Sequence, residues 1–246
     1  MTSFVDHSPP LQPSRPDHPS TSTPLAVCDR AGRTFGSGRQ ATVAVHDASC
    51  TIWAGDRIAL VGPSGSGKST LLHLLGGLDI PTSGTVRWPA LDHEGTPGGS
   101  EVATVFQGGS LVPSLTVLEN VGLPLLLAGK TAAEAHDAAN VALSQLAIGE
   151  LAQVLPEELS GGQAQRASVA RAVASSPRLL LADEPTGKLD HQAATIVIDV
   201  LLEAADALSA ALVVATHDQA IAERLKTGWT MDSGRLHAPA SAVGHR

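Results

Sequence analysis

The sequence predicts an α/β fold with a mostly parallel sheet, a small antiparallel β lobe near the N-terminus and a helical lobe in the middle. Short apolar runs typical of buried strands recur at residues 57–61, 101–106, 179–182 and 212–216. Helix-length segments separate most of these runs, and strands that alternate with helices form parallel sheets. Residues 25–53 contain short stretches of alternating apolar and polar residues between turns, a pattern typical of antiparallel strands.

The composition limits the classes of function. The 246 residues are 43% hydrophobic and 16% charged, which is enough apolar material for a sizeable core. The net charge of -8, without any lysine or arginine run, argues against nucleic acid as a partner. Cys28 and Cys50 are expected to be buried small side chains in a reducing compartment. Without a signal-peptide pattern or an apolar run of about 18 residues, the chain is expected to be neither secreted nor membrane-spanning.

The two ends of the chain are expected to differ from its body. Residues 1–24 contain six of the 16 prolines and five serines, too little apolar surface to offset the entropy of ordering. We therefore predict a disordered tail there. Residues 25–236 are predicted to form the folded domain, with the helical lobe at about 108–176, and residues 237–246 a C-terminal tail.

Local signals mark several element boundaries. Thr116 to Glu119 and Thr131 to Glu134 are capping boxes, in which a hydroxyl and a carboxylate satisfy unpaired amides at a helix start. Residues 69–78 predict a helix that Gly76 and Gly77 end, and residues 160–175 predict another. The dipeptide Ser233–Gly234 predicts a hairpin at the end of the domain.

A glycine-rich loop between the strand at 57–61 and the helix after it matches the pattern G-x-x-x-x-G-K-[ST] in the context that the pattern requires. Its backbone amides converge on phosphates, the helix N-terminus adds positive potential, and Lys68 supplies a point charge. Ser69 is expected to bind Mg²⁺ through its hydroxyl. The residues assigned to this phosphate-binding loop are Gly62, Pro63, Ser64, Gly65, Ser66, Gly67, Lys68, Ser69 and Thr70.

Two carboxylates follow the strand at 179–182. Asp183 is expected to serve the metal, and Glu184 to act as general base for the water that attacks the γ-phosphate. An Asp-Glu pair is more often a solvated strand end, but the phosphate-binding loop favours the catalytic interpretation. Ser160, Gly161, Gly162 and Gln163 open a helix and form a second anion-binding device, although an ordinary N-cap has the same residues.

With these residues in order, the chain resembles the nucleotide-binding subunit of an ATP-binding cassette (ABC) transporter over residues 25–236. Gly62 to Ser69 is similar to its Walker A loop, Leu159 to Gln163 to its signature, and Leu179 to Glu184 to its Walker B strand. Gln107 resembles the Q-loop glutamine, Leu189–Asp190 the D-loop, and His217 the switch histidine. The resemblance implies a P-loop NTPase fold in which two subunits enclose two ATP molecules, so that Ser160 to Gly162 act across the dimer.

The resemblance implies the remaining roles. His217 would orient the catalytic water, Gln107 would bind Mg²⁺ and sense a membrane partner, and Phe35 would stack on adenine. Each has a plainer alternative: a polar strand end for the first two, and core packing for Phe35. Lys188 in the D-loop departs from the family pattern and leaves the rate of hydrolysis open.

Residues 106–127 resemble the branch that includes macrolide exporters, lipoprotein-release ATPases and the cell-division ATPase. This implies a permease with a large extracytoplasmic domain as partner, docked at Leu111, Val112 and Leu115, unless these leucines and valine pack the helical lobe. An ATPase on the inner face of the cell membrane is the main hypothesis. A regulatory ATP-binding clamp and a soluble ABC ATPase are the alternatives.

Overall fold

The structure, a computed structural model, describes residues 22–91, 97, 101–108, 110–187 and 189–239. The predicted disordered tail lies almost entirely outside these residues, as do Lys188 and the last seven residues. The chain forms a nine-stranded sheet in the order β4-β1-β2-β9-β8-β3-β7-β6-β5. Its strands are β1 (Ala26–Phe35), β2 (Thr42–Ile52), β3 (Arg57–Val61), β4 (Ser83–Arg87), β5 (Val102–Val105), β6 (Leu179–Asp183), β7 (Ala211–Thr216), β8 (Thr227–Asp232) and β9 (Arg235–His237).

The predicted fold class is confirmed. Strands β8, β3, β7, β6 and β5 are parallel neighbours, whereas β4, β1 and β2 pair antiparallel. The helices are α1 (Lys68–Leu75), α2 (Val117–Leu127), α3 (Ala132–Gln145), α4 (Gly161–Ala174), α5 (His191–Ala207) and α6 (Gln219–Ala222). Short 3-10 helices are η1 (Gly38–Gln40), η2 (Gly149–Leu151) and η3 (Pro156–Glu158).

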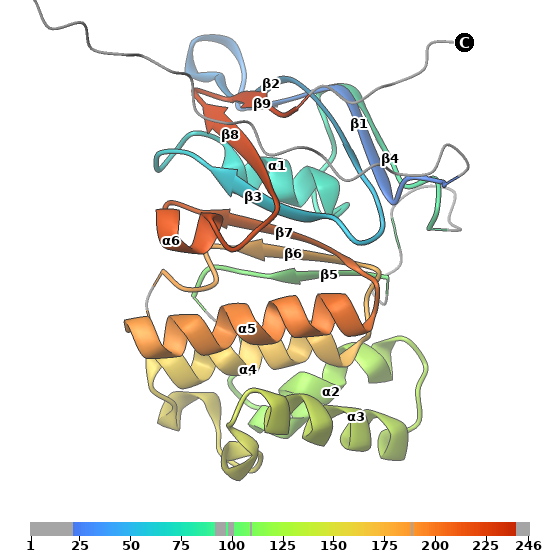
Figure 1. The fold of residues 1–246 in the computed structure, drawn as a ribbon, viewed down its shortest axis with the longest axis vertical. Coiled ribbons are helices and arrows are strands. Elements are labelled where there is room, and N and C mark those ends of the chain that lie inside the picture. The colour runs from blue at the N-terminus through green and yellow to red at the C-terminus, as the bar shows by residue number, and fades with distance from the viewer. Residues whose placement is uncertain (1–21, 92–96, 98–100, 109, 188, 240–246) are drawn as a thin grey trace, which may run out of the picture.

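Two hydrophobic cores fill the two faces of the parallel sheet. In β6, Leu180 and Ala182 face the core made with α2 to α5, and Leu179 and Leu181 face the core around α1. Figure 1 shows α4 and α5 covering one face, with α1 between the other face and the antiparallel strands. Within a strand, successive side chains point to opposite faces of the sheet. Because other elements cover both faces, the side chains on both sides of these strands are apolar.

The cysteines lie where the sequence predicts, inside the β lobe. Cys28 of β1 is directly opposite Cys50 of β2, and both thiols are free and buried. A hydrogen bond from Cys50 lowers the pKa of Cys28 and, with burial, raises the pKa of Cys50. They act as small core side chains.

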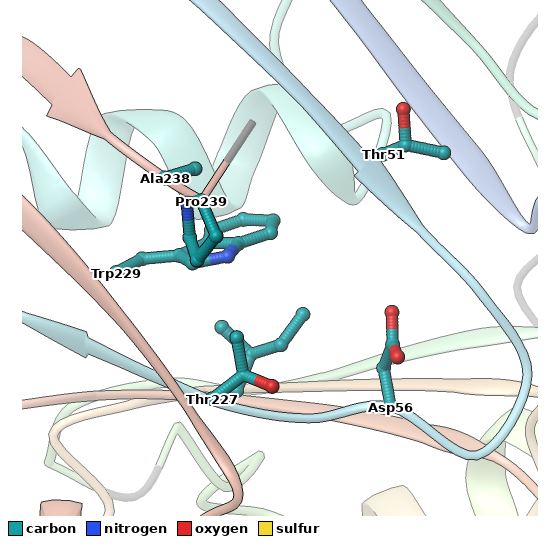
Figure 2. Close-up of a pocket in the computed structure, with 7 residues that line it drawn as sticks. Thr51, Asp56, Thr227, Trp229, Ala238 and Pro239 are labelled. Atoms are coloured by element: carbon teal, nitrogen blue, oxygen red, sulfur yellow. The ribbon is translucent and has the colours of Figure 1, made fainter. Parts of the chain in front are cut away.

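The C-terminal hairpin forms at the expected dipeptide. Ser233 and Gly234 both have positive φ, 48° and 79°, as a two-residue hairpin turn with the twist of its strands requires. His237, which the sequence assigns to the tail, is the last residue of β9. Figure 2 shows Ala238 and Pro239 continuing past it, beside the buried Trp229, where they help to line a small pocket.

No helix in the described part of the chain is long and apolar enough to cross a membrane.

Candidate functional site

The predicted motifs converge at one edge of the parallel sheet. The phosphate-binding loop follows β3 and His217 follows β7. Asp183 ends β6, Glu184 comes directly after it, and Gln107 lies two residues after β5. These four strands are neighbours in the order β3-β7-β6-β5, and all are parallel. Their carboxyl ends therefore meet at the edge where open α/β sheets bind ligands (Figure 1).

The glycines of the loop are required by space as well as by backbone conformation. Gly67, the N-cap of α1, has a φ of 103°, and a Cβ there would lie 2.2 Å from the carbonyl oxygen of Ala44. At Gly62 a Cβ would lie 2.1 Å from the carbonyl oxygen of Met231. Any larger residue would push the loop off β2 and β8, and the loop would lose its curvature.

A pocket opens at the N-terminus of α1, where unpaired backbone amides and the helix dipole favour an anion. It is lined by Ala44, Ser64, Gly65, Gly67, Lys68, Ser69, Thr70, Gln107 and Glu184. The sequence analysis predicted all of these except Ala44. An alanine in a strand gives no chemical sign of a binding role. Ala44 is identified only in the folded chain, where its carbonyl oxygen lies against Gly67 of the loop.

Lys68 is buried and held by the loop itself. Its Nζ donates hydrogen bonds to the carbonyl oxygens of Gly62 at 2.8 Å and Pro63 at 3.0 Å, and lies 3.8 Å from Oε1 of Glu184. The other oxygen of Glu184 lies 3.1 Å from Nδ1 of His217. A cation, a carboxylate and an imidazole thus form a continuous chain that leads from the pocket to His217, which lies outside the pocket lining.

Glu184 has a strained backbone. Its φ is 45°, in the left-handed region that non-glycine residues rarely adopt, and its amide donates to the carbonyl oxygen of Ala215 at 3.0 Å. Such strain costs of order 1–3 kcal/mol and concentrates at functional sites. The turn aims the carboxylate toward Lys68 and His217 instead of along the strand.

Asp183 is buried beside the pocket. Only 5% of it is exposed, and its Oδ1 has no hydrogen-bond partner among the residues that the structure describes. A buried carboxylate oxygen without a donor is suited to an ion or to a water bound to an ion.

The signature residues lie elsewhere. Ser160 is the N-cap of α4 and forms a full capping box with Gln163, as the N-cap alternative predicts, while the anion-binding role stays a prediction. Among the described residues, no atom lies within 4 Å of a Cβ added at Gly161, and a Cβ added at Gly162 would lie 3.4 Å from Cδ2 of Leu189. Within the described residues, none of these four lines the pocket around Lys68. The signature faces outward from its own chain.

Asp190 and Phe35 also lie outside that pocket lining. Asp190 is the N-cap of α5 and accepts a hydrogen bond from the amide of Ala193 at 2.8 Å. Phe35 ends β1 and is 44% exposed, so the core-packing alternative fails for it. Its ring instead contacts the guanidinium of Arg33.

The segment after Gln107 is fixed to the helical lobe. Asn120, which is fully buried, accepts a hydrogen bond from the amide of Val112 and donates to the carbonyl oxygens of Val112 and Leu115. Arg171 of α4 donates to the carbonyl oxygen and the hydroxyl of Ser110. Through Arg171, the segment contacts the helix that begins with the signature.

Comparison with known proteins decides the family. The profile of the ABC transporter family matches residues 45–187. The lipoprotein-releasing system ATP-binding protein LolD of Legionella pneumophila (strain Paris) is 41% identical over 213 residues, which is 84% of this chain and 94% of the relative. The chain belongs to the ABC transporter ATP-binding family. It is an ATPase, as the resemblance implies.

Further relatives of this ABC ATPase agree. LolD of Xanthomonas euvesicatoria pv. vesicatoria (strain 85-10) is 40% identical over 232 residues, covering 92% of this chain and 95% of the relative. The dimeric post-hydrolysis structure of the ATP-binding cassette MJ0796 bound to ADP and Pi superimposes with a TM-score of 0.80 at 30% identity, covering 90% of this chain and all of that one. A second dimeric structure of MJ0796, described as a bacterial ABC transporter cassette, has a TM-score of 0.79. The predicted branch, which includes lipoprotein-release ATPases, is confirmed.

Proposed function

We propose that two copies of this ABC ATPase enclose two ATP molecules, and that their hydrolysis drives a separate permease of the exporter or mechanotransmission type. The observation that carries the proposal is that the motifs lie on two different surfaces of the chain. The phosphate-binding loop, Gln107, Glu184 and His217 share one edge of the sheet, whereas Ser160 to Gln163 face outward. A signature that faces away from its own pocket is suited to the pocket of a second copy.

Within the pocket, each polar group has a proposed task. The loop amides and Lys68 bind the phosphates, and Lys68 exchanges its two carbonyl partners for phosphate oxygens. Glu184 takes the proton of the attacking water, and His217, 3.1 Å from that carboxylate, orients the water and the γ-phosphate. The strained backbone of Glu184 supports this role, because it holds the carboxylate in place before ATP binds.

The same residues fit Mg²⁺. Hard oxygen ligands suit this ion, which proteins usually bind through one or two carboxylates together with substrate phosphates. We propose Ser69 and Gln107 as direct ligands and Asp183 through a water, a role supported by its buried Oδ1, which has no hydrogen-bond partner in the described part of the chain. When bound, the ion neutralises charge on the phosphates.

Across the dimer, Ser160, Gly161, Gly162 and Gln163 would bind the γ-phosphate held by the partner. The helix N-terminus of α4 supplies amides for this purpose, and the open space at Gly161 lets another chain approach closely. Asp190 would lie at the seam next to Leu189, whose Cδ2 would be 3.4 Å from a Cβ added at Gly162. Phe35 would form the platform for the adenine. The dimeric cassette MJ0796 supports this arrangement.

A groove between the two lobes is the proposed docking face for the permease. It is lined by Gly76, Gly77, Leu78, Pro97, Val102, Ala103, Thr104, Phe106, Pro124, Arg171, Ala172 and Ser175. Exposed apolar side chains border it: Ile80 is 73% exposed and Leu127, one helical turn after Pro124, is 80% exposed. An apolar face of this kind marks an interaction site.

The three residues that the resemblance assigns to docking are packed against the chain itself. Leu111 packs on the helical-lobe core, and Val112 and Leu115 are half-buried around Asn120. We therefore propose that these three position the segment after Gln107, while Ile80 and Leu127 meet the partner. The LolD relatives, named for a lipoprotein-releasing system, support a role in a release system. We propose a permease with a large extracytoplasmic domain as partner and a place on the inner face of the membrane, as the family resemblance implies.

We propose the domain division that the sequence predicts, with a tail at residues 1–24, an ABC ATPase domain at 25–236 whose helical lobe spans about 108–176, and a tail at 237–246. One change is needed at the C-terminal boundary, because His237 ends β9 and therefore belongs to the domain.

A pull-down tests the permease. Glu184→Gln, which should bind ATP without hydrolysing it, is incubated with ATP, Mg²⁺ and detergent-solubilised membranes of the source organism, and co-purifying proteins are identified by mass spectrometry. We expect a permease with few transmembrane helices and a large external domain. Adding Leu127→Asp should abolish its capture, whereas adding Val141→Asp, on the exposed face of α3, should not.

Other outcomes contradict the proposal in different ways. A permease with many helices would place the chain in a solute transport system. Capture of no membrane protein, with the ATPase rate unchanged by membranes, would favour the regulatory clamp or the soluble ABC ATPase.

A further inference from the structure

We propose that Arg33 is a positioning residue for the nucleotide base: its guanidinium covers one face of the Phe35 ring and holds the ring so that a purine stacks on the other face. The inference rests on the proposed role of Phe35. It assigns to the chain a two-residue platform: the base stacks on the ring of Phe35, and the guanidinium of Arg33 fixes the position of that ring.

The contact follows from the strand. Arg33 and Phe35 are two residues apart in β1 and thus point to the same side. The central carbon of the guanidinium lies 4.6 Å from the ring centroid, well within the range of a cation–π interaction. Phe35 is 44% exposed, so the ring keeps an open surface although one face is covered.

Arg33 is itself held by a neighbouring loop. Its Nε donates to Oδ2 of Asp79 at 2.8 Å, and its Nη1 to the hydroxyl of Thr82 at 3.5 Å. That loop is attached to β1, because the amide of Thr82 donates to the carbonyl oxygen of Gly32 at 2.7 Å and the amide of Thr34 donates to the Thr82 hydroxyl. The ion pair is only about one-quarter exposed on both sides. A guanidinium with its in-plane donors engaged presents its flat face to the ring.

The platform lies within reach of the phosphate-binding pocket. Phe35 is opposite Thr42 in the ladder between β1 and β2, and Ala44, two residues further along β2, lines the pocket. At about 3.3 Å per residue along a strand, the two positions are roughly 7 Å apart. This separation suits a ligand with a triphosphate at one end and an aromatic base at the other.

The arrangement has a thermodynamic consequence. A ring that is already held loses less conformational freedom when the base arrives, so Arg33 should increase affinity without touching the ligand. Stacking depends on the aromatic face and tolerates different bases. The class of ligand is therefore a nucleoside triphosphate, and the effect of Arg33 should disappear for a ligand without a base.

Calorimetric titration with ATP and with inorganic triphosphate tests this. Phe35→Ala should weaken ATP binding about tenfold, since stacking on an aromatic residue contributes of order 1–3 kcal/mol per base. Arg33→Ala should weaken it about threefold, as expected for a partly exposed cation–π contact. Combined with Phe35→Ala, Arg33→Ala should add nothing. The affinity for inorganic triphosphate should stay unchanged throughout. Arg39→Ala, which removes an exposed cation from the following turn, is the matched control for charge alone.

The possible failures are distinguishable. If Arg33→Ala weakens ATP and triphosphate binding equally, or no more than Arg39→Ala does, Arg33 acts through charge or folding and the inference is overturned. The same holds if its effect persists in full without the Phe35 ring. If Phe35→Ala binds ATP like the unmodified chain, the platform itself fails. If Phe35→Ala weakens ATP binding and Arg33→Ala does not, only the inference about Arg33 fails.

Discussion

At the scale of single residues, Lys68 illustrates how the site is prepared for its ligand. Its ammonium is buried, yet two loop carbonyls and the nearby Glu184 carboxylate compensate the charge. A buried cation without partners would be costly. An arriving phosphate therefore replaces neutral acceptors with a charged one, and such charge-assisted hydrogen bonds are the stronger kind.

We expect Lys68→Ala to weaken ATP binding by about tenfold or more, because a buried hydrogen bond to a charged group contributes about 1.5–3 kcal/mol. Fluorescence titration with a labelled ATP analogue measures the change. Lys130→Ala removes the same charge from an exposed loop and should have no effect. Equal affinities of the unmodified chain and Lys68→Ala for ATP would show that the loop does not bind phosphate as proposed.

The sequence predicted most of the pocket but not the contacts that fix it. The spacing of Gly62, Gly67 and Lys68 is local, so a pattern identifies it. The ring contact of Arg33 and its ion pair with Asp79, 46 residues away, depend on a loop that folds back onto β1. No periodicity in the chain indicates such a pair.

At the scale of elements, the helix starts follow their capping signals closely. The boxes at Thr116 and Thr131 both form, with the carboxylates of Glu119 and Glu134 accepting from the N-cap amides at 2.7 and 2.8 Å. These are short-range interactions, and the sequence therefore predicts them well. The carboxylates also lie at the positive ends of their helix dipoles.

The two boxes predict a pH dependence of stability. The hydrogen bonds from the N-cap amides hold the pKa of Glu119 and of Glu134 below the ordinary value of 4.5. A lowered pKa in the folded state stabilises the fold above the ordinary value, and this contribution disappears as the pH falls through the lowered one. We expect the double variant Glu119→Gln and Glu134→Gln to unfold at a lower temperature than the unmodified chain at pH 7. Thermal denaturation should show that this difference shrinks as the pH falls below 4.5; a difference independent of pH would contradict the assignment.

The strands were harder to predict where the ladder is irregular. Within residues 25–53, where the sequence predicts short alternating stretches, β2 (Thr42–Ile52) is one long strand, in which Asp47 has a φ of 42° and the register with β1 shifts. Strand β4 was missed altogether. Its residues are mostly exposed at the sheet edge and give no apolar alternation. Bulges and edges depend on the pairing partner, which a sequence pattern does not include.

At the scale of the whole molecule, one chain presents half of each proposed ATP site on two different surfaces. The pocket at Lys68 ends the parallel sheet, and the signature begins α4 in the helical lobe. Arg171 joins that helix to the segment after Gln107 and also lines the groove proposed for the permease. The proposed docking groove and the proposed dimer surface are therefore joined by α4, which contacts the segment that leaves the nucleotide pocket at Gln107.

The most direct test of this account is the ATP-dependent dimerisation of Glu184→Gln, measured by sedimentation velocity. We predict that ATP and Mg²⁺ double the 25.1 kDa mass of the chain. Adding Gly161→Asp should prevent the change without reducing ATP binding, because a Cβ at Gly161 would meet no atom of the described residues within 4 Å and the new carboxylate would oppose the phosphates bound by the partner. The account is contradicted if Glu184→Gln binds ATP and stays monomeric, or if the Gly161→Asp combination dimerises equally well.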